Sequence, residues 1–286
     1  MLASGSKLGG ALTLLALGCS ATPSGYTSDA EAGSTHGLIT VERSTSVDEP
    51  ARAAAFAAFV RTPPEIDPAT VMRLAGLGLE LPALGQCSEV SRERDSSQPL
   101  SGLGRIEFLD AGDVLLRTSD TTAALAPRAF PAVLDISGVV YTTRDRSAEP
   151  LPAATHYSLG ASGGALGAFS VAVDAPAPPS DVRVSGIPLA ELSAVSTHSA
   201  LVLEWLPGSA TDAIYADLST ADGSATLRCS LGDTGNGSVP AGAFAGVGAG
   251  QLALHRVRSA AFSSPAIDAG QVRFDFQAAK AVSFVE

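Results

Sequence analysis

Short runs in which apolar and polar residues alternate recur along most of this chain, and they limit the fold more than any other feature. The clearest is Gln271–Phe276, where Val272, Phe274 and Phe276 alternate with polar residues. A period of two places every second side chain on one face of a β-strand, whereas an amphipathic helix repeats every 3.6 residues. The chain is therefore predicted to be mainly β, with Val272, Phe274 and Phe276 facing a core.

The first half of the chain is predicted to form a β-rich region with one short helix. The segments read as strands are Leu38–Arg43, Cys87–Val90, Arg105–Leu109, Val114–Arg117, Val139–Thr142 and Phe169–Val173. Asp110–Asp113 is predicted to be the turn of a hairpin between two of them. A helix is predicted at Ala69–Ala75, with Asp67 as its N-cap and Pro68 in its first turn.

Ala51–Arg61 fits two interpretations. Its alanine content and the spacing of Phe56, Phe59 and Val60 favour a helix. The prolines that bracket it, and the β character of later segments, favour a strand paired with the first one. We favour the strand.

The second half is predicted to form an antiparallel β-sandwich. Its expected strands are Asp181–Ile187, Leu201–Trp205, Ala213–Leu218, Thr226–Leu231, Gln251–Arg258, Gln271–Phe276 and a last one containing Val282 and Phe284. Asp222-Gly223 is a typical hairpin turn. Many short strands with turns between them are typical of a sandwich, and Trp205 would lie in its core with Leu201 and Leu203.

Part of this second half resembles a fibronectin type III domain. The resemblance rests on P-P-S-D-V-R-V at 178–184, L-x-L-x-W-x-P at 201–207 and Ile214-Tyr215-Ala216. It covers roughly forty residues and does not extend to the later strands, where Leu252–Arg256 departs from the family pattern. It implies that Trp205 packs between two sheets.

The N-terminus has the pattern of a secretory signal. Lys7 is followed by the apolar run Leu8–Leu17 and then by Gly18-Cys19. The run is too short to span a bilayer, which needs about 20 residues. The cysteine after the cut resembles the lipobox of bacterial lipoproteins, which implies that Cys19 is acylated. The alternative is an ordinary signal peptide cut nearby.

These observations predict five regions and a place in the bacterial cell envelope. The regions are a signal peptide at 1–18, a lipidated Cys19 with a flexible tether at 19–36, an N-terminal β-rich domain at 37–174, a proline-rich linker at 175–180 and a C-terminal β-sandwich domain at 181–286. The net charge of -11 repels nucleic acid and offers no basic patch for anionic lipid. The expected membrane contact is therefore the N-terminal lipid.

Two cysteines remain beyond Cys19, namely Cys87 and Cys229. An exported chain permits a disulfide between them, provided that their Cα atoms come within about 7 Å. Cys229 is in phase with Leu227 and Leu231 and is expected to face a core. The sequence therefore does not decide whether the disulfide forms. No cysteine or histidine spacing is typical of zinc, and no cofactor is expected.

Three motifs resemble patterns found in catalytic or metal-binding sites. Gly160–Gly164 matches the G-x-S-x-G pattern, with Ser162 as a candidate nucleophile and His198 or His255 as its base. A strand, not a helix, follows it, which favours a glycine-rich hairpin. Gly232–Ser238 and the pair Asp110 and Asp113 resemble pieces of calcium loops, but tight turns also explain them. The four histidines, His36, His156, His198 and His255, are read as surface or loop residues.

The expected function is a non-catalytic structural or interaction role, such as adhesion or scaffolding, at the cell envelope, with another envelope protein as a candidate partner. A serine hydrolase that uses Ser162 is one alternative. A ligand- or cation-binding β-sandwich module is the other.

Overall fold

The computed structural model describes residues 33–47, 49–74, 76–90, 106–133, 136–143, 151–153 and 155–286. The predicted signal peptide, Cys19 and most of the predicted tether lie outside these residues. No helix within the described part of the chain is long and apolar enough to cross a membrane.

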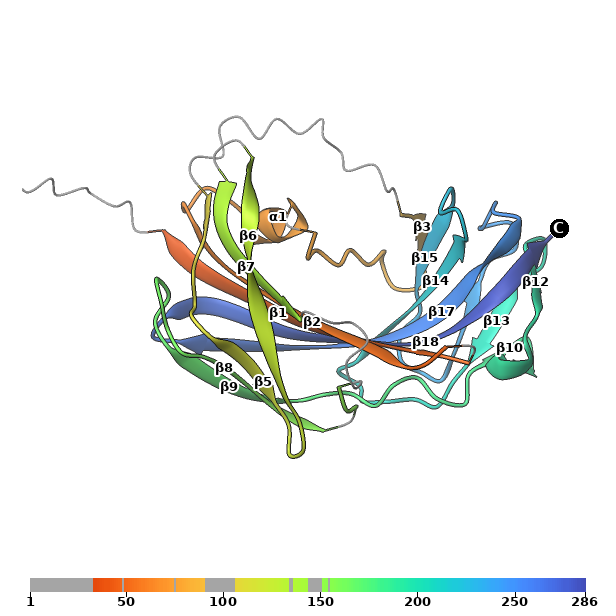
Figure 1. The fold of residues 1–286 in the computed structure, drawn as a ribbon. Coiled ribbons are helices and arrows are strands. Elements are labelled where there is room, and N and C mark those ends of the chain that lie inside the picture. The colour runs from red at the N-terminus through yellow and green to blue at the C-terminus, as the bar shows by residue number, and fades with distance from the viewer. Residues whose placement is uncertain are drawn as a thin grey trace, which may run out of the picture. The chain divides into compact units, whose positions relative to one another are not determined.

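The described residues form eighteen strands, one α-helix and one 3-10 helix (Figure 1). Their bounds are β1 Ser34–Ser46, β2 Arg52–Thr62, α1 Pro68–Leu74, β3 Cys87–Glu89, β4 Ile106–Phe108, β5 Val114–Arg117, β6 Thr122–Val133, β7 Ile136–Thr143, β8 His156–Ala161, β9 Phe169–Asp174, β10 Arg183–Val184, β11 Ile187–Pro188, η1 Leu189–Glu191, β12 Ala194–Ser196, β13 Leu201–Glu204, β14 Ala213–Thr220, β15 Thr226–Ser230, β16 Asn236–Val239, β17 Gly248–Ser264 and β18 Ile267–Val285. The chain is mainly β, as predicted.

The strands form two sheets. The large sheet has the order β3-β15-β14-β17-β18-β1-β2-β4-β7-β6-β5-β8-β9, with β12 also paired to β18. It is mixed, because β1 runs parallel to β18 and β4 parallel to β7. The small sheet, β11-β10-β13-β16, is antiparallel.

The two sheets share one core, which is compatible with a β-sandwich. Leu201, Leu203 and Trp205 from the segment of β13 pack in the same buried cluster as Ile214 and Leu254 from the large sheet. Trp205 is 4% exposed. The predicted alternation therefore directs Leu201, Leu203 and Trp205 inward.

The long strand β18 contributes to two clusters with the same face. Val272, Phe274 and Phe276 belong to a first core, and Val282 and Phe284 belong to the sandwich core. All five are buried because residues two apart on a strand point the same way. One strand thus connects the two halves of the described fold.

The proline-rich segment 175–180 does not separate two independent domains. β1 lies before it and β18 after it, yet His36–Ser46 pairs with Ala269–Ala279. Ala32–Glu286 accordingly forms one compact unit. The segment is also bound to the sheet, because the Arg256 guanidinium donates hydrogen bonds to the carbonyl oxygens of Ala177 and Pro178, at 3.0 and 3.3 Å.

Several local predictions agree with the structure. Ala51–Arg61 is a strand, β2, paired antiparallel with β1. The Asp67 carboxylate accepts hydrogen bonds from the backbone N–H groups of Ala69 and Thr70, so it caps α1. β14 and β15 form the hairpin predicted around Asp222-Gly223.

Two local predictions are wrong. Asp110–Asp113 is not a hairpin turn, because β4 pairs with β2 and β7 while β5 pairs with β6 and β8. Leu109 and Ala111 are buried in the first core, whereas the tip of a hairpin would be exposed. Asp181–Ile187 is not one strand either. Ser185 and Gly186 both have positive φ, 50° and 81°, and this turn separates β10 from β11.

Candidate functional site

A row of polar side chains lies on the face of the large sheet opposite to Val272, Phe274 and Phe276. We call it the polar strip. It crosses five neighbouring strands, β15, β14, β17, β18 and β1. Its members are Arg228 on β15, Tyr215 and Asp217 on β14, His255 on β17, Arg273, Asp275 and Gln277 on β18, and Glu42 and Ser44 on β1.

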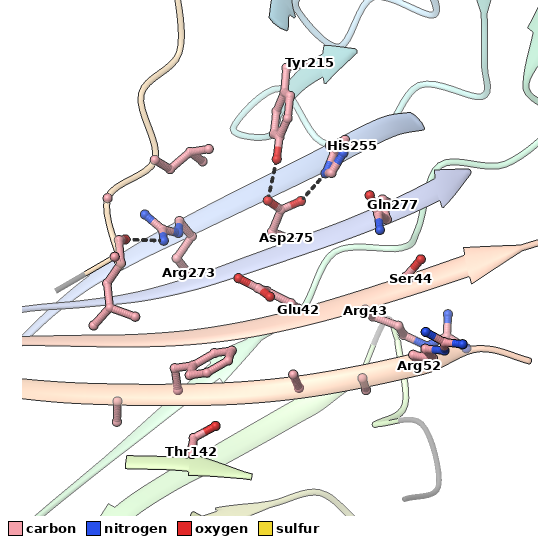
Figure 2. Close-up of a pocket in the computed structure, with 18 of the residues that line it drawn as sticks. Glu42, Arg43, Ser44, Arg52, Thr142, Tyr215, His255, Arg273, Asp275 and Gln277 are labelled. Carbon is pink, nitrogen blue, oxygen red and sulfur yellow. Dashed lines mark hydrogen bonds and ion pairs between the residues drawn. The ribbon is translucent and has the colours of Figure 1, made fainter. Parts of the chain in front are cut away.

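Asp275 is the centre of the polar strip (Figure 2). The Tyr215 hydroxyl donates a hydrogen bond to its Oδ2 at 2.6 Å, and His255 Nδ1 lies 2.9 Å from its Oδ1. An ionised carboxylate only accepts, so His255 Nδ1 must bear the hydrogen. Burial opposes ionisation of Asp275. Three contributions outweigh burial: the charge of His255, the hydrogen bond of His255 and the hydrogen bond of the Tyr215 hydroxyl. The pKa of Asp275 is therefore lowered.

Tyr215 is fixed on both sides of its ring. The His255 ring stacks on it with 4.2 Å between centroids, and the Arg228 guanidinium lies 4.6 Å from the ring centroid. Arg228 is oriented by a two-point ion pair with Asp217, at 2.9 and 2.7 Å. Burial, followed by the Asp275 charge, raises the pKa of Tyr215, so the phenol remains a hydrogen-bond donor.

Glu42 and Asp275 occupy opposite positions on the parallel strands β1 and β18. Like charges in this arrangement repel. Arg273 offsets the repulsion, because both carboxylates act electrostatically on its guanidinium. Burial is nevertheless the larger influence and lowers the pKa of Arg273. The centre of the polar strip therefore contains both signs of charge.

The chain between α1 and β3 passes over the polar strip (Figure 1). We call residues 76–86 the strap. Arg273 Nη2 donates to the Leu77 carbonyl oxygen at 2.7 Å, and Arg228 Nη1 donates to that of Glu80 at 3.3 Å. Backbone hydrogen bonds between Ser230 and both Gly85 and Gln86 attach its far end. Side chains of the sheet thus bind the strap mainly through its backbone.

A cavity of about 860 Å³ lies between the strap and the sheet (Figure 2). It is lined by the polar strip except Asp217, by Gly76–Leu79 of the strap, and by Arg43, Glu49, Arg52 and Phe56 of β1, β2 and their connection. Its volume is in the range of cavities that bind small molecules, about 300–1,000 Å³. The arrangement can bind a ligand that presents charged or hydrogen-bonding groups.

The structure joins Cys87 and Cys229 in a disulfide, with 4.0 Å between the Cα atoms. Cys87 lies on the edge strand β3 directly opposite Cys229 of β15, so Cys229 reaches it while remaining in the core. The sequence alone did not decide whether this bridge forms, because the pairing of strands whose cysteines are 142 residues apart is not visible in it. The disulfide fixes the end of the strap.

Trp205 lies outside the cavity. Its Nε1 donates to Asp233 Oδ1 at 2.7 Å, and Asp233 also pairs with the buried Arg256, with 3.0 Å between Nε and Oδ2. Asp233 belongs to the calcium-like segment Gly232–Ser238. Its carboxylate is already used by a tryptophan, a guanidinium and the backbone N–H of Gly208. No group of metal-binding side chains occurs among the described residues.

Ser162 connects two loops. Its Oγ accepts a hydrogen bond from the Asp113 backbone N–H at 2.8 Å, while its own N–H donates to the Asp113 carbonyl oxygen. β8 ends at Ala161, and His156 begins it, so at about 3.3 Å per residue the two side chains stand roughly 20 Å apart along the strand. His156 pairs with Asp174, and His255, one of the two histidines predicted as a base for Ser162, pairs with Asp275.

All four histidines were expected to be surface or loop residues. The structure shows that this is not true of all of them. His255 lies within β17 and its side chain is only 12% exposed. His36 lies within β1, which begins at Ser34, three residues before the predicted start of structure. Asp275, Arg273 and Tyr215 were also missed as site residues. The sequence pattern that could have identified this site is the alternation of Arg273, Asp275 and Gln277 along a strand whose other face lies in the core.

The fold and the site define a mainly β protein with a charged cavity on one face of a mixed sheet. No protein-family model matches the sequence, and no curated protein sequence matches it. One solved structure with a weak likeness contains the FN1–FN3 domains of chicken CNTN1, at 12% identity and a TM-score of 0.22. The match covers 70% of this chain and 66% of that one, just under two thirds.

A second likeness is to the Fcho1 Mu homology domain of Danio rerio with a bound Eps15 peptide. The identity is 12%, the TM-score is 0.26, and the match covers 89% of this chain and 99% of that chain. At these TM-scores neither likeness defines the function of this chain.

Proposed function

We propose that this chain is an exported, lipid-anchored protein of the bacterial cell envelope that binds a ligand or a partner molecule through the cavity under the strap. Its role is interaction and not catalysis. The observation that supports this most is the cavity itself, which charged and polar side chains from five neighbouring strands line.

The export and the anchor are supported by the sequence alone. The apolar run before Gly18-Cys19, with Lys7 ahead of it, is the basis for acylation of Cys19. The disulfide between Cys87 and Cys229 agrees with an oxidising compartment. The burial of Trp205 between two sheets supports a fibronectin type III-like second half.

Membrane fractionation tests the anchor. The unaltered protein is expected in the membrane fraction, and Cys19→Ser is expected to release it into the soluble fraction, because a single residue bears the lipid. Membrane association that Cys19→Ser leaves unchanged would contradict the proposal.

Native mass spectrometry of the full-length protein, purified gently from its own membrane, tests ligand binding. A non-covalent adduct is expected that is lost on unfolding. Ser44→Trp is expected to abolish the adduct, because Ser44 lines the cavity and the indole would obstruct it. The matched control is Ser170→Trp on the exposed side of β9, which is expected to retain the adduct. An adduct that survives Ser44→Trp would refute binding in the cavity.

A further inference from the structure

The carboxylates and guanidinium groups that line the cavity balance one another. Arg43 is set aside, because it lies on the core face of β1, opposite the buried Phe276. The rest of the described lining holds three carboxylates and three guanidinium groups, those of Glu42, Glu49, Asp275, Arg52, Arg228 and Arg273. The formal charges of these six groups cancel.

Most of these charges already have a partner within the protein. Arg228 forms its ion pair with Asp217, and Arg52 pairs with Glu49, with 2.9 Å between Nη2 and Oε2. The Asp275 carboxylate already has a phenol and an imidazole as partners. A charged group on a ligand that approaches one member of an ion pair is repelled by the like charge of the other member. A ligand without net charge avoids this repulsion.

Neutral polar side chains at the centre of the cavity remain for a ligand. Ser44 on β1 is directly opposite Gln277 on β18, and Gln277 is directly opposite His255 on β17 (Figure 2). Within the described residues, neither the Ser44 hydroxyl nor the Gln277 carboxamide has a hydrogen-bond partner. His255 uses Nδ1 for Asp275, which leaves its Nε2. A hydroxyl and a carboxamide can each donate and accept.

Hydroxyl groups on a ligand match this lining better than other neutral groups do. One hydroxyl can donate to a carboxylate and at the same time accept from a guanidinium or a carboxamide. An amide nitrogen only donates, and an amide oxygen only accepts. A hydroxyl also matches Nε2 of His255 in either protonation state of the ring, because this nitrogen accepts when the ring is neutral and donates when it is charged.

Apolar side chains line the cavity as well. Phe56 of β2 is only half-buried there, and Leu77 and Leu79 of the strap are close to it in the lining. Sites for small molecules combine apolar surface with a few placed polar groups. A sugar ring has both kinds of group, because its hydroxyls form hydrogen bonds and its C–H groups make apolar contacts.

We propose that the ligand is a neutral saccharide whose hydroxyl groups form hydrogen bonds with Ser44, Gln277 and His255 and whose C–H groups contact Phe56. This inference rests on the proposed binding function and specifies the class of ligand that the same cavity recognises.

The test is an NMR titration of the purified full-length chain with sugars that differ in charge. The neutral probes are D-glucose, D-galactose and N-acetyl-D-glucosamine. Their charged counterparts are D-glucuronate, D-galacturonate and D-glucosamine, and N-acetylalanine methyl amide is a neutral probe without hydroxyl groups. The side-chain amide resonances of Gln277, identified by their absence in Gln277→Ala, are expected to shift with at least one neutral sugar. Its charged counterpart and the methyl amide are expected to bind more weakly.

Variants then locate the binding. Gln277→Ala and Ser44→Ala are each expected to weaken the responding sugar about three- to tenfold, as for the loss of one neutral hydrogen bond. Gln271→Ala is the matched control and should bind like the unaltered protein. Gln271 is exposed on the same face of β18, roughly 20 Å from Gln277 along the strand, and does not line this cavity. Unchanged binding in both Gln277→Ala and Ser44→Ala would overturn the assigned contacts.

The outcomes separate this inference from the proposed function. If the methyl amide or a charged sugar binds better than every neutral sugar, and Ser44→Trp abolishes that binding, the cavity binds ligands but the saccharide inference is wrong. If no neutral sugar shifts the Gln277 resonances, the saccharide inference is likewise overturned, while the adduct in native mass spectrometry still tests the proposed function. If sugar binding persists in Ser44→Trp, the cavity is not the binding site and both fail.

Discussion

Tyr215 and Asp275 are 60 positions apart in the sequence and joined by a hydrogen bond of 2.6 Å across two strand pairings. His255, on the strand between them, pairs with the same carboxylate. The contact places an ionised group within a sheet whose opposite face is apolar core. Its energetics lead to the first two predictions.

Asp275→Asn is expected to lower the free energy of unfolding by about 1–3 kcal/mol at pH 7, because two buried donors lose a charged acceptor. The folded pKa of Asp275 is below its ordinary value of 3.8. A carboxyl group whose pKa is lower in the folded protein stabilises the fold at pH values above its unfolded pKa. This stabilisation is lost as the pH falls through the folded pKa. Urea unfolding should therefore show the difference between the two proteins shrinking below about pH 4. A difference that stays constant down to pH 2 would contradict this.

Alkaline pH is expected to destabilise the protein through its buried tyrosines. Burial raises the pKa of Tyr141 and Tyr157 to about 12, and that of Tyr215 also rises. A tyrosine whose pKa is higher in the folded protein stabilises the fold at pH values below its unfolded pKa of 10. This stabilisation is lost as the pH rises through the folded pKa. Absorbance at the phenolate band should show these three tyrosines ionising only above pH 10, together with unfolding. Their ionisation near pH 10 in the folded protein would refute the burial argument.

Removal of the disulfide is expected to loosen the strap. In Cys87→Ser/Cys229→Ser, amide exchange across residues 76–86 should rise far more than exchange in the centre of β17, since the lost link joins β3, at the end of the strap, to β15. The free energy of unfolding should fall by about 2–5 kcal/mol, as for loss of a bridge that closes a long loop. Equal exchange of the strap in both proteins would show that Arg273 and Arg228 fix it without the disulfide.

Trp205, the single tryptophan, reports on the sandwich core. Trp205→Ala is expected to cost about 3–5 kcal/mol, the range for removing a large aromatic side chain from a core. Trp205→Phe should cost less, because it loses mainly the hydrogen bond to Asp233. The native emission should be blue-shifted and poorly quenched by acrylamide. Emission like that of free tryptophan would contradict the burial.

Ser162→Ala is expected to leave ligand binding unchanged. It should cost about 0.5–1.5 kcal/mol, because one hydrogen bond from the Asp113 N–H is lost at an exposed loop. A fluorophosphonate probe is expected not to label the unaltered protein. Labelling that Ser162→Ala abolishes would favour the hydrolase alternative.

The local features of the fold were predictable from the sequence. Alternation identified β13, β17, the Gln271–Phe276 part of β18 and the inward direction of Trp205, because the strand period of two depends on neighbouring residues only. Asp67 and Pro68 identified α1 for the same reason, since a helix cap is a contact within four residues. The sequence alone also identified the apolar face and the polar face of Gln271–Phe276.

The pairing of distant strands was decided by the tertiary structure alone. The prolines at 175–180 predicted a boundary, but β1 pairs with β18, and Arg256 binds the carbonyl oxygens of Ala177 and Pro178. The site was hidden for the same reason, because Asp275 acquires His255 and Tyr215 only when β14, β17 and β18 lie side by side. A strand's pattern determines which face each residue occupies, whereas the neighbour that covers that face depends on register between segments far apart in the chain.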